Sequence, residues 1–182
     1  VDVLTAAENM VLGIKEKGRL NIKAVGEKIR KINEQYGFNV DPDKKIYDMS
    51  VSEKQTVEIV KMLYRGADVL ILDEPTAGQD YRHYTDIIKF INRLNSDYGK
   101  TIIFITHDMH LAIENTDRAI VFADGEIIAD ESVYSVLSND EIIERANLKQ
   151  TSLYTLAKKL GIPPEKFIEH FIRYERMVKA DE

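Results

Sequence analysis

The first third of the chain carries apolar residues at helical spacing. They recur every three or four positions over residues 21–35, which predicts an amphipathic helix. The segment Thr5–Leu12 predicts a shorter helix, because Thr5 and Glu8 have the spacing of a capping box. A third helix is expected to begin near Ser50, since five apolar residues between positions 57 and 63 form its inner side.

Two short apolar runs farther along the chain do not alternate with polar residues. They are Val69–Leu72 and Thr101–Ile105, and such runs are typical of parallel strands that are buried on both faces. A helix is predicted between them over Tyr81–Tyr98, where apolar residues return to helical spacing. This order of elements predicts an α/β fold with parallel strands.

The last third of the chain predicts a hairpin followed by helices. An Asp-Gly turn at residues 124–125 joins two predicted strands, Ala119–Phe122 and Glu126–Asp130. From Ser132 onward the pattern is helical, and it ends in a helix over Pro164–Val178. This last helix carries more apolar positions than a surface helix needs, so we expect it to dock on another surface.

Composition narrows the class of protein. The 182 residues carry a formal charge of −6 and a pI of about 5.3, which argues against non-specific nucleic-acid binding because that needs a basic surface. The chain has no cysteine, so disulfides and thiolate metal sites are excluded. No apolar run approaches the roughly 20 residues that span a bilayer.

The first apolar run ends abruptly in Asp73, Glu74 and Pro75. Ligands bind at the carboxyl ends of strands in open α/β sheets, and two adjacent acids there suit phosphoryl transfer, one for Mg²⁺ and one for a water molecule. We expect Pro75 to keep Glu74 extended. The alternative is an ordinary strand end with solvated charges.

His107 follows the second apolar run and is expected at the same edge as Asp73 and Glu74. A histidine there can hydrogen-bond a phosphate or an attacking water, although a lone histidine is more often structural. Ser50 and Ser52 stand at the start of the third helix, where serines usually serve as N-caps. The functional alternative is an anion site at the positive end of the helix dipole.

Four segments resemble motifs of the ATP-binding subunits of ABC transporters, in matching order and spacing. They are Met49–Gln55, Val69–Pro75, Ala77–Asp80 and Thr106–His107, and in that family they are the signature motif, the Walker B strand, the D-loop and the H-switch. The resemblance implies a partial P-loop NTPase core with parallel strands, an α-helical subdomain before it and a C-terminal helical extension after it.

The resemblance also implies roles for single residues. Asp73 would hold Mg²⁺ through water, Glu74 would polarise the attacking water, and His107 would contact the γ-phosphate. The segment from Ser50 through Val51 and Ser52 to Glu53 would face ATP on the opposite subunit. Asp80 would couple the two nucleotide sites.

Partners and location follow from the same resemblance. ATP and Mg²⁺ are the expected cofactors, in the complete protein rather than in these residues alone. A second ATP-binding subunit and transmembrane permease subunits are the expected partners, with no nucleic acid among them. The expected location is peripheral, on the cytoplasmic face of the cell membrane.

The sequence departs from the family pattern at three places. No G-x-x-x-x-G-K-[ST] motif is present, so the chain is expected to begin after the family's Q-loop. Val51, Ser52 and Glu53 replace the signature's glycines and glutamine, and an acid is repulsive beside a polyphosphate. Gln79 replaces the usual D-loop leucine.

The missing Walker A segment has an energetic consequence. Four or five charge-assisted hydrogen bonds, at about 1.5–3 kcal/mol each, would be absent, whereas micromolar binding corresponds to only about −8 kcal/mol. These residues alone are therefore expected neither to hold nor to hydrolyse ATP. In the family the Walker A strand lies between the strands over 102–105 and 119–122, so we expect those two strands to close up or to recruit another chain.

Two branches of the family contribute to the resemblance. Residues up to about Thr76 resemble sugar and nucleoside importers, and residues from about Gly78 resemble energy-coupling-factor importers of vitamins and their precursors, which suggests a composite chain. The expected division is a helical subdomain with the signature helix at 1–65, the C-terminal half of the ATPase core at 66–131 and the extension at 132–182.

Two functions remain open at this point. The first is the ATP-binding and hydrolysing part of an ABC-type importer for a small solute such as a vitamin precursor, nucleoside or sugar. The second is a catalytically inactive fragment or composite that folds and associates without turning over ATP. A chromosome- or repair-type ATPase would show long heptad repeats before the signature, and residues 21–35 are too short for that.

Overall fold

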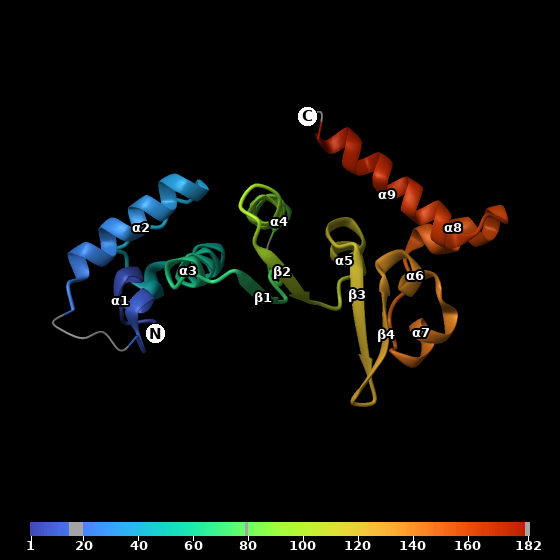
Figure 1. Ribbon diagram of the computed structural model, residues 1–182, viewed down its shortest axis with the longest axis horizontal. Helices are drawn as coiled ribbons and strands as arrows, with labels where there is room; N and C mark the ends of the chain where they lie inside the picture. The colour runs from blue at the N-terminus through green and yellow to red at the C-terminus, as the bar shows by residue number, and fades with distance from the viewer. Residues whose placement is uncertain (15–19, 79, 181–182) are drawn as a thin grey trace. The chain divides into compact units, whose positions relative to one another are not determined.

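The computed structural model describes residues 1–14, 20–78 and 80–180. The chain divides into two compact units, Val1–Ile105 and Thr106–Glu182, which are described separately below. Figure 1 shows the order of their helices and strands along the chain. The division expected from the sequence, with boundaries after residues 65 and 131, stays a prediction.

The first unit begins with helices that match the predicted ones. Its elements are α1 (Ala6–Val11), α2 (Ile22–Tyr36), the 3-10 turn η1 (Ile46–Asp48), α3 (Val51–Tyr64), β1 (Val69–Asp73), α4 (Tyr81–Ser96) and β2 (Thr101–Ile105). Thr5 and Glu8 form the predicted capping box on α1, with Glu8 N–H donating to Thr5 Oγ1 at 3.2 Å. Gly37 ends α2 at a φ of 75°, a conformation that glycine adopts without strain.

Strands β1 and β2 form a parallel pair, as predicted. Leu70 lies opposite Ile102, Leu72 opposite Phe104, and Asp73 opposite Ile105. Paired residues share a face of the sheet, so the register separates the even-numbered apolar residues from the odd-numbered ones.

The prediction that both faces of this sheet are buried is wrong for the described residues. Leu70 is fully buried, whereas Ile71 is 58% exposed, and Ile103 and Ile105 on the same face are also exposed. A parallel sheet normally needs a covering layer on each face. Among the described residues of the Val1–Ile105 unit, one face of the sheet is buried and the other is exposed.

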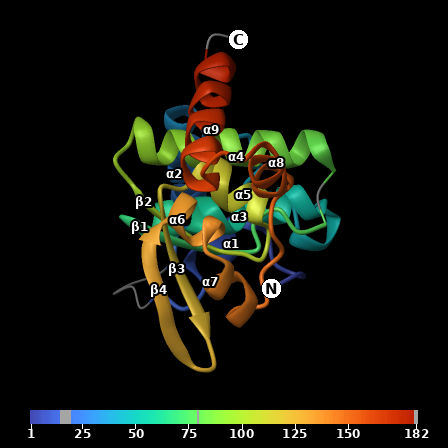
Figure 2. The same cartoon turned by 90° about the vertical axis from the view of Figure 1, so that its right-hand side faces the viewer.

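The second unit combines a hairpin with helices. Its elements are α5 (Met109–Asn115), β3 (Arg118–Ala123), β4 (Glu126–Ser132), α6 (Val133–Ser138), α7 (Asp140–Arg145), α8 (Ser152–Leu160) and α9 (Pro164–Ala180). Figure 2 shows β3 and β4 side by side as an antiparallel hairpin. Asp124 and Gly125 have positive φ values of 54° and 80°, which confirms the predicted tight turn.

A hydrophobic core holds the second unit together, and α9 docks on it as expected. Its buried residues are Met109, Ile113, Val133, Tyr134, Leu137, Ile143, Tyr154, Ile168 and Ile172. The last two come from α9 and are almost fully buried. Along the same helix Tyr174 and Met177 are exposed.

The expectation that β2 and β3 close up stays a prediction, because the two strands belong to different units. Among the described residues β1 pairs with β2 and β3 pairs with β4, in two separate two-stranded sheets. A two-residue turn closes the β3–β4 hairpin at little entropic cost, so β3 takes its neighbour along the chain as partner. Recruitment of another chain at these edges stays a prediction.

Within residues 1–14, 20–78 and 80–180, no helix has both the length and the hydropathy that a bilayer-spanning segment requires.

Substitutions on the two faces of the β1–β2 sheet should lower the free energy of unfolding by unequal amounts. Leu70→Ala should lower the free energy of unfolding by about 2–5 kcal/mol, because it leaves a cavity in a packed core. Ile71→Ala, one position along the strand, should change it by less than about 0.5 kcal/mol, because that side chain is exposed. Urea denaturation of both variants checks this, and equal costs would show that the second face is covered in solution.

Candidate functional site

Asp73 and Glu74 stand at the carboxyl end of β1. Asp73 is the last residue of the strand and lies opposite Ile105. The backbone N–H of Glu74 donates to the Ile105 carbonyl at 2.8 Å, so the ladder continues for one bond beyond the strand. Two adjacent carboxyl groups are thereby held at the edge where α/β sheets bind ligands.

The prediction that Pro75 keeps Glu74 extended is wrong. Glu74 has a φ of 43°, in the left-handed region that residues other than glycine rarely adopt. Its N–H bonds to Ile105, and its carbonyl accepts a hydrogen bond from Ala77 N–H at 3.0 Å. These two bonds hold a turn directly after the strand. Strained backbone of this kind clusters at functional sites, so the observation supports a function for Glu74.

The residues from Ser50 to Glu53 form the amino-terminal end of α3. Ser50 is the N-cap, as predicted, and its hydroxyl accepts a hydrogen bond from Glu53 N–H at 3.2 Å. In return a Glu53 carboxylate oxygen accepts a hydrogen bond from Ser50 N–H at 2.8 Å. Val51 is exposed and Ser52 is half-buried. Ser50 thus caps the helix, and contact of this segment with an anion stays a prediction.

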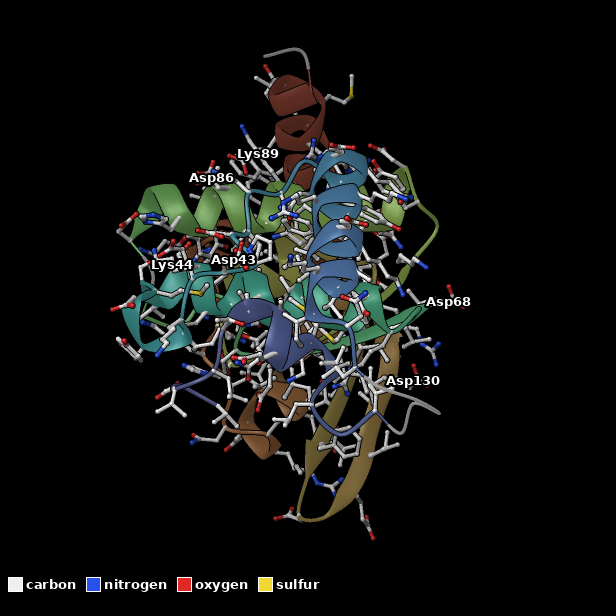
Figure 3. All side chains as sticks on the ribbon, turned by 90° about the vertical axis from the view of Figure 1, so that its left-hand side faces the viewer. Asp43, Lys44, Asp68, Asp86, Lys89 and Asp130 are labelled. Carbon is white, nitrogen blue, oxygen red and sulfur yellow. The ribbon has the colours of Figure 1, made fainter. Side chains whose placement is uncertain are left out.

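Lys44 is a member of this region that sequence reasoning missed. Its ammonium donates to a Glu53 carboxylate oxygen at 2.7 Å, and Figure 3 labels it near α3. This bond, together with the bond from Ser50 N–H, holds the pKa of the Glu53 carboxyl below its ordinary value of 4.5. Lys44 offsets the negative charge that was expected to repel a polyphosphate.

Asp80 caps the start of α4. One carboxylate oxygen accepts a hydrogen bond from His83 N–H at 3.0 Å, and the other lies 2.6 Å from His83 Nδ1. His83 was not a candidate in the sequence, although its i, i+3 spacing from an N-cap acid was a usable signal. The neighbouring Gln79 lies outside the described residues.

His107 belongs to the second unit, directly before α5. Its side chain is exposed, and the surrounding turn is held by Asp108, whose N–H donates to Thr106 Oγ1 at 3.0 Å. Asp108 also caps α5 by accepting hydrogen bonds from His110 N–H and Leu111 N–H. The expectation that His107 shares an edge with Asp73 and Glu74 stays a prediction.

The structure brings some of the candidate residues together and separates others. Asp73 and Glu74 are adjacent at one strand end. Ser50 stands at the opposite end of α3 from the turn that leads into β1, and a helix of 14 residues is about 21 Å long. A pocket of about 160 Å³ beside the first turns of α3, lined in part by Ser52 and Glu53, is smaller than usual ligand pockets.

Asp73 is the candidate metal ligand. No group of three or more histidine or acidic residues among the described residues could hold a metal ion. Mg²⁺ is usually bound by one or two carboxylates together with water and substrate phosphates. One carboxylate at a strand end fits Mg²⁺ that arrives with a nucleotide.

Comparison with known proteins gives the family. The model of the family described as "ABC transporter" matches residues 2–77. These residues belong to an ABC transporter ATP-binding domain. A provisionally named ABC transporter ATP-binding protein of Vibrio parahaemolyticus is 39% identical over 170 residues, which is 93% of this chain and 29% of that relative. A similarly named protein of Clostridium perfringens is 41% identical over 170 residues, with 93% and 30% covered.

Solved structures show that the chain has the fold of ABC ATPase cassettes. CbiO1 from Clostridium perfringens, part of the ABC transporter complex CbiONQ, has a TM-score of 0.58 and 26% identity, over 84% of this chain and 59% of that chain. The dimeric cassette MJ0796 bound to ADP and Pi has a TM-score of 0.59 and 25% identity, over 73% and 58%. The P-loop NTPase fold expected from the sequence is confirmed.

The matches span most of this chain and a smaller part of each relative. The chain spans less than a third of the length of the curated relatives it matches. Matches over 93% of the chain also run across the expected join near residue 77, so they do not separate an importer branch for sugars from one for vitamins.

The Lys44–Glu53 contact predicts a measurable pKa change. Lys44→Met should raise the pKa of Glu53 toward 4.5, because the strongest hydrogen bond to the carboxylate is lost. A folded-state pKa below 4.5 stabilises the native state above pH 4.5, and this contribution is lost as the pH falls through the folded-state pKa. Carboxyl-carbon NMR titration of both forms measures the change.

A matched control for this titration lies on the same helix. Lys61→Met removes a lysine whose ammonium lies 3.2 Å from Glu58, and it should leave the pKa of Glu53 unchanged. An unchanged pKa of Glu53 in the Lys44→Met variant would contradict the assignment of Lys44 as its partner.

Proposed function

We propose that these residues form the signature helix, the Walker B strand end and the C-terminal extension of an ATP-hydrolysing subunit of an ABC-type importer. The imported substrate would be a small solute such as a vitamin precursor, a nucleoside or a sugar. The similarity to CbiO1, which is part of the transporter complex CbiONQ, supports the energy-coupling-factor branch among these possibilities.

The observation that carries the proposal is the left-handed backbone of Glu74 at the end of β1. A φ of 43° in a residue other than glycine is strained unless its surroundings hold it. Here the bonds to Ile105 and from Ala77 hold it. The turn places a second carboxyl group directly after Asp73, in a family whose chemistry is nucleotide hydrolysis.

The two acids would divide the chemistry between them. Asp73 would hold, through water, the Mg²⁺ bound with ATP. When bound, Mg²⁺ neutralises the charge that develops on the transferred phosphoryl group. Glu74 would orient the attacking water and accept its proton. His107 would donate a hydrogen bond to the γ-phosphate.

Partners follow from the same proposal. A second ATP-binding subunit would meet the Ser50 end of α3, since Ser50 is separated from the turn into β1 by the length of that helix. The dimeric state of MJ0796 supports such an arrangement. Transmembrane permease subunits would select the solute, and the subunit would lie at the cytoplasmic face of the membrane.

The phosphate cradle would come from residues other than these 182. No Walker A motif occurs in the sequence, and the backbone N–H groups and lysine of that motif supply the main contacts to the phosphates. We therefore propose that this chain alone does not turn over ATP. The same proposal holds that a Walker A segment supplied from outside restores turnover.

A phosphate-release assay tests this function. The chain alone should show no turnover, and the chain mixed with a separately expressed Walker A half should release phosphate. In that mixture Glu74→Gln should lower the rate by about 10²–10⁴-fold, the range for loss of a general base. Glu58→Gln is the control, because it makes the same chemical change on an exposed part of α3 and should leave the rate unchanged.

The alternatives have distinct outcomes. Turnover by the chain alone that is lost in Glu74→Gln would overturn the need for a supplied cradle. A mixture that forms a complex and stays inactive would favour the non-enzymatic alternative. Equal rates for Glu74→Gln and Glu58→Gln would remove Glu74 from the mechanism.

A further inference from the structure

Arg176 on α9 holds the carboxyl-terminal end of α5. Its Nε donates to the Glu114 carbonyl at 2.9 Å, and one terminal nitrogen donates to the carbonyls of Thr116 at 3.2 Å and Ile113 at 3.4 Å. The other terminal nitrogen lies 3.1 Å from an Asp117 carboxylate oxygen. One guanidinium therefore meets four acceptors from residues at and just after the end of a short helix.

The chemistry of a helix end explains why this contact matters. The last four carbonyls of a helix have no partner within the helix, and a guanidinium carries five donors in a rigid fork. The helix α5 has only seven residues, too few to be stable by itself in water. Its geometry therefore depends on tertiary contacts, and Arg176 supplies polar ones at one end.

Packing adds a second link between the same two helices. Met109 and Ile113 of α5 belong to one hydrophobic core with Ile168 and Ile172 of α9. All four are buried. Apolar packing sets the distance between the helices but tolerates sliding, whereas directed hydrogen bonds from Arg176 fix their register.

The other end of α5 leads directly to His107. Asp108 caps the helix through His110 N–H and Leu111 N–H, at 2.9 Å and 3.2 Å. Asp108 N–H in turn donates to Thr106 Oγ1 at 3.0 Å. His107 stands between these two residues, so a shift or fraying of α5 would move the backbone that carries its imidazole.

We propose that Arg176 is a positioning residue that sets the place of His107 through α5. The C-terminal extension then helps to fix the position of His107, because it contains Arg176. The role of His107 toward phosphate rests on the proposed function, whereas the mechanical coupling from Arg176 to His107 is a property of the second unit and can be tested without nucleotide.

The test compares two arginines on α9. Arg176→Ala should speed amide exchange at Ala112 in α5 and at Thr116 directly after it by about tenfold or more. It should also shift the imidazole signal of His107 in the NMR spectrum. Arg173→Ala is the matched control, because the Arg173 guanidinium pairs with Glu169 on α9 itself, at 2.7 Å. In that control, the amide exchange rates at Ala112 and Thr116 should stay within about twofold of wild type. The imidazole signal of His107 should not shift.

The histidine signal separates positioning from simple stability. The chain has four histidines, and His107→Gln assigns the signal of interest. If Arg176→Ala speeds exchange in α5 but leaves the His107 signal unshifted, Arg176 only stabilises α5. That result would overturn the proposal. Wild-type behaviour of Arg176→Ala in both measurements would overturn it as well.

Milder variants decide the matter if Arg176→Ala does not fold. Arg176→Lys keeps the charge but loses the fork, and Asp117→Asn removes the charge of one acceptor at an exposed side chain. Both should give smaller changes of the same kind, in α5 exchange and in the His107 signal. No change at His107 in either folded variant would contradict the proposal. These measurements need no ATP. The proposed ATPase activity can therefore fail its own test without changing the result expected for Arg176.

Discussion

The parallel ladder between β1 and β2 is the constraint on which the candidate site depends. The register that places Asp73 opposite Ile105 also decides which apolar side chains enter the core, because a shift by one residue would exchange the two faces. The backbone N–H of Glu74, one residue beyond the end of β1, donates to the Ile105 carbonyl. This hydrogen bond extends the ladder into the turn that follows the strand. The two acids are thus placed by backbone bonds, before any side-chain contact is considered.

The same ladder leaves apolar surface uncovered. Ile71, Ile103 and Ile105 lie on its exposed face, and a parallel sheet is normally covered on both faces. The hairpin of the second unit exposes Phe122 in a similar way. These surfaces agree with a chain that spans less than a third of its relatives.

Local charge pairs give two charged residues roles that the sequence pattern does not predict. Glu53 was expected to repel a polyphosphate, yet its carboxylate is occupied by Lys44 and by Ser50 N–H. Arg176 stands among several charges near the end of the chain that a helical pattern alone would leave solvated, yet it bonds to the end of α5. In each case two segments meet in space and change the role of a charged residue.

The sequence by itself determined the elements and most of their ends, because helical spacing, the Thr5–Glu8 capping box and the Asp-Gly turn act over a few residues. The contiguous motif around Asp73 and Glu74 pointed to the right family for a similar reason. Only the tertiary structure decided which face of the β1–β2 sheet is exposed, the left-handed backbone of Glu74 and the partners of Arg176. Glu74 depends on a carbonyl more than 30 residues away, and Arg176 lies about 60 residues from its acceptors. Contacts over such separations leave no periodic pattern in the sequence, because they are set by how the packed elements meet.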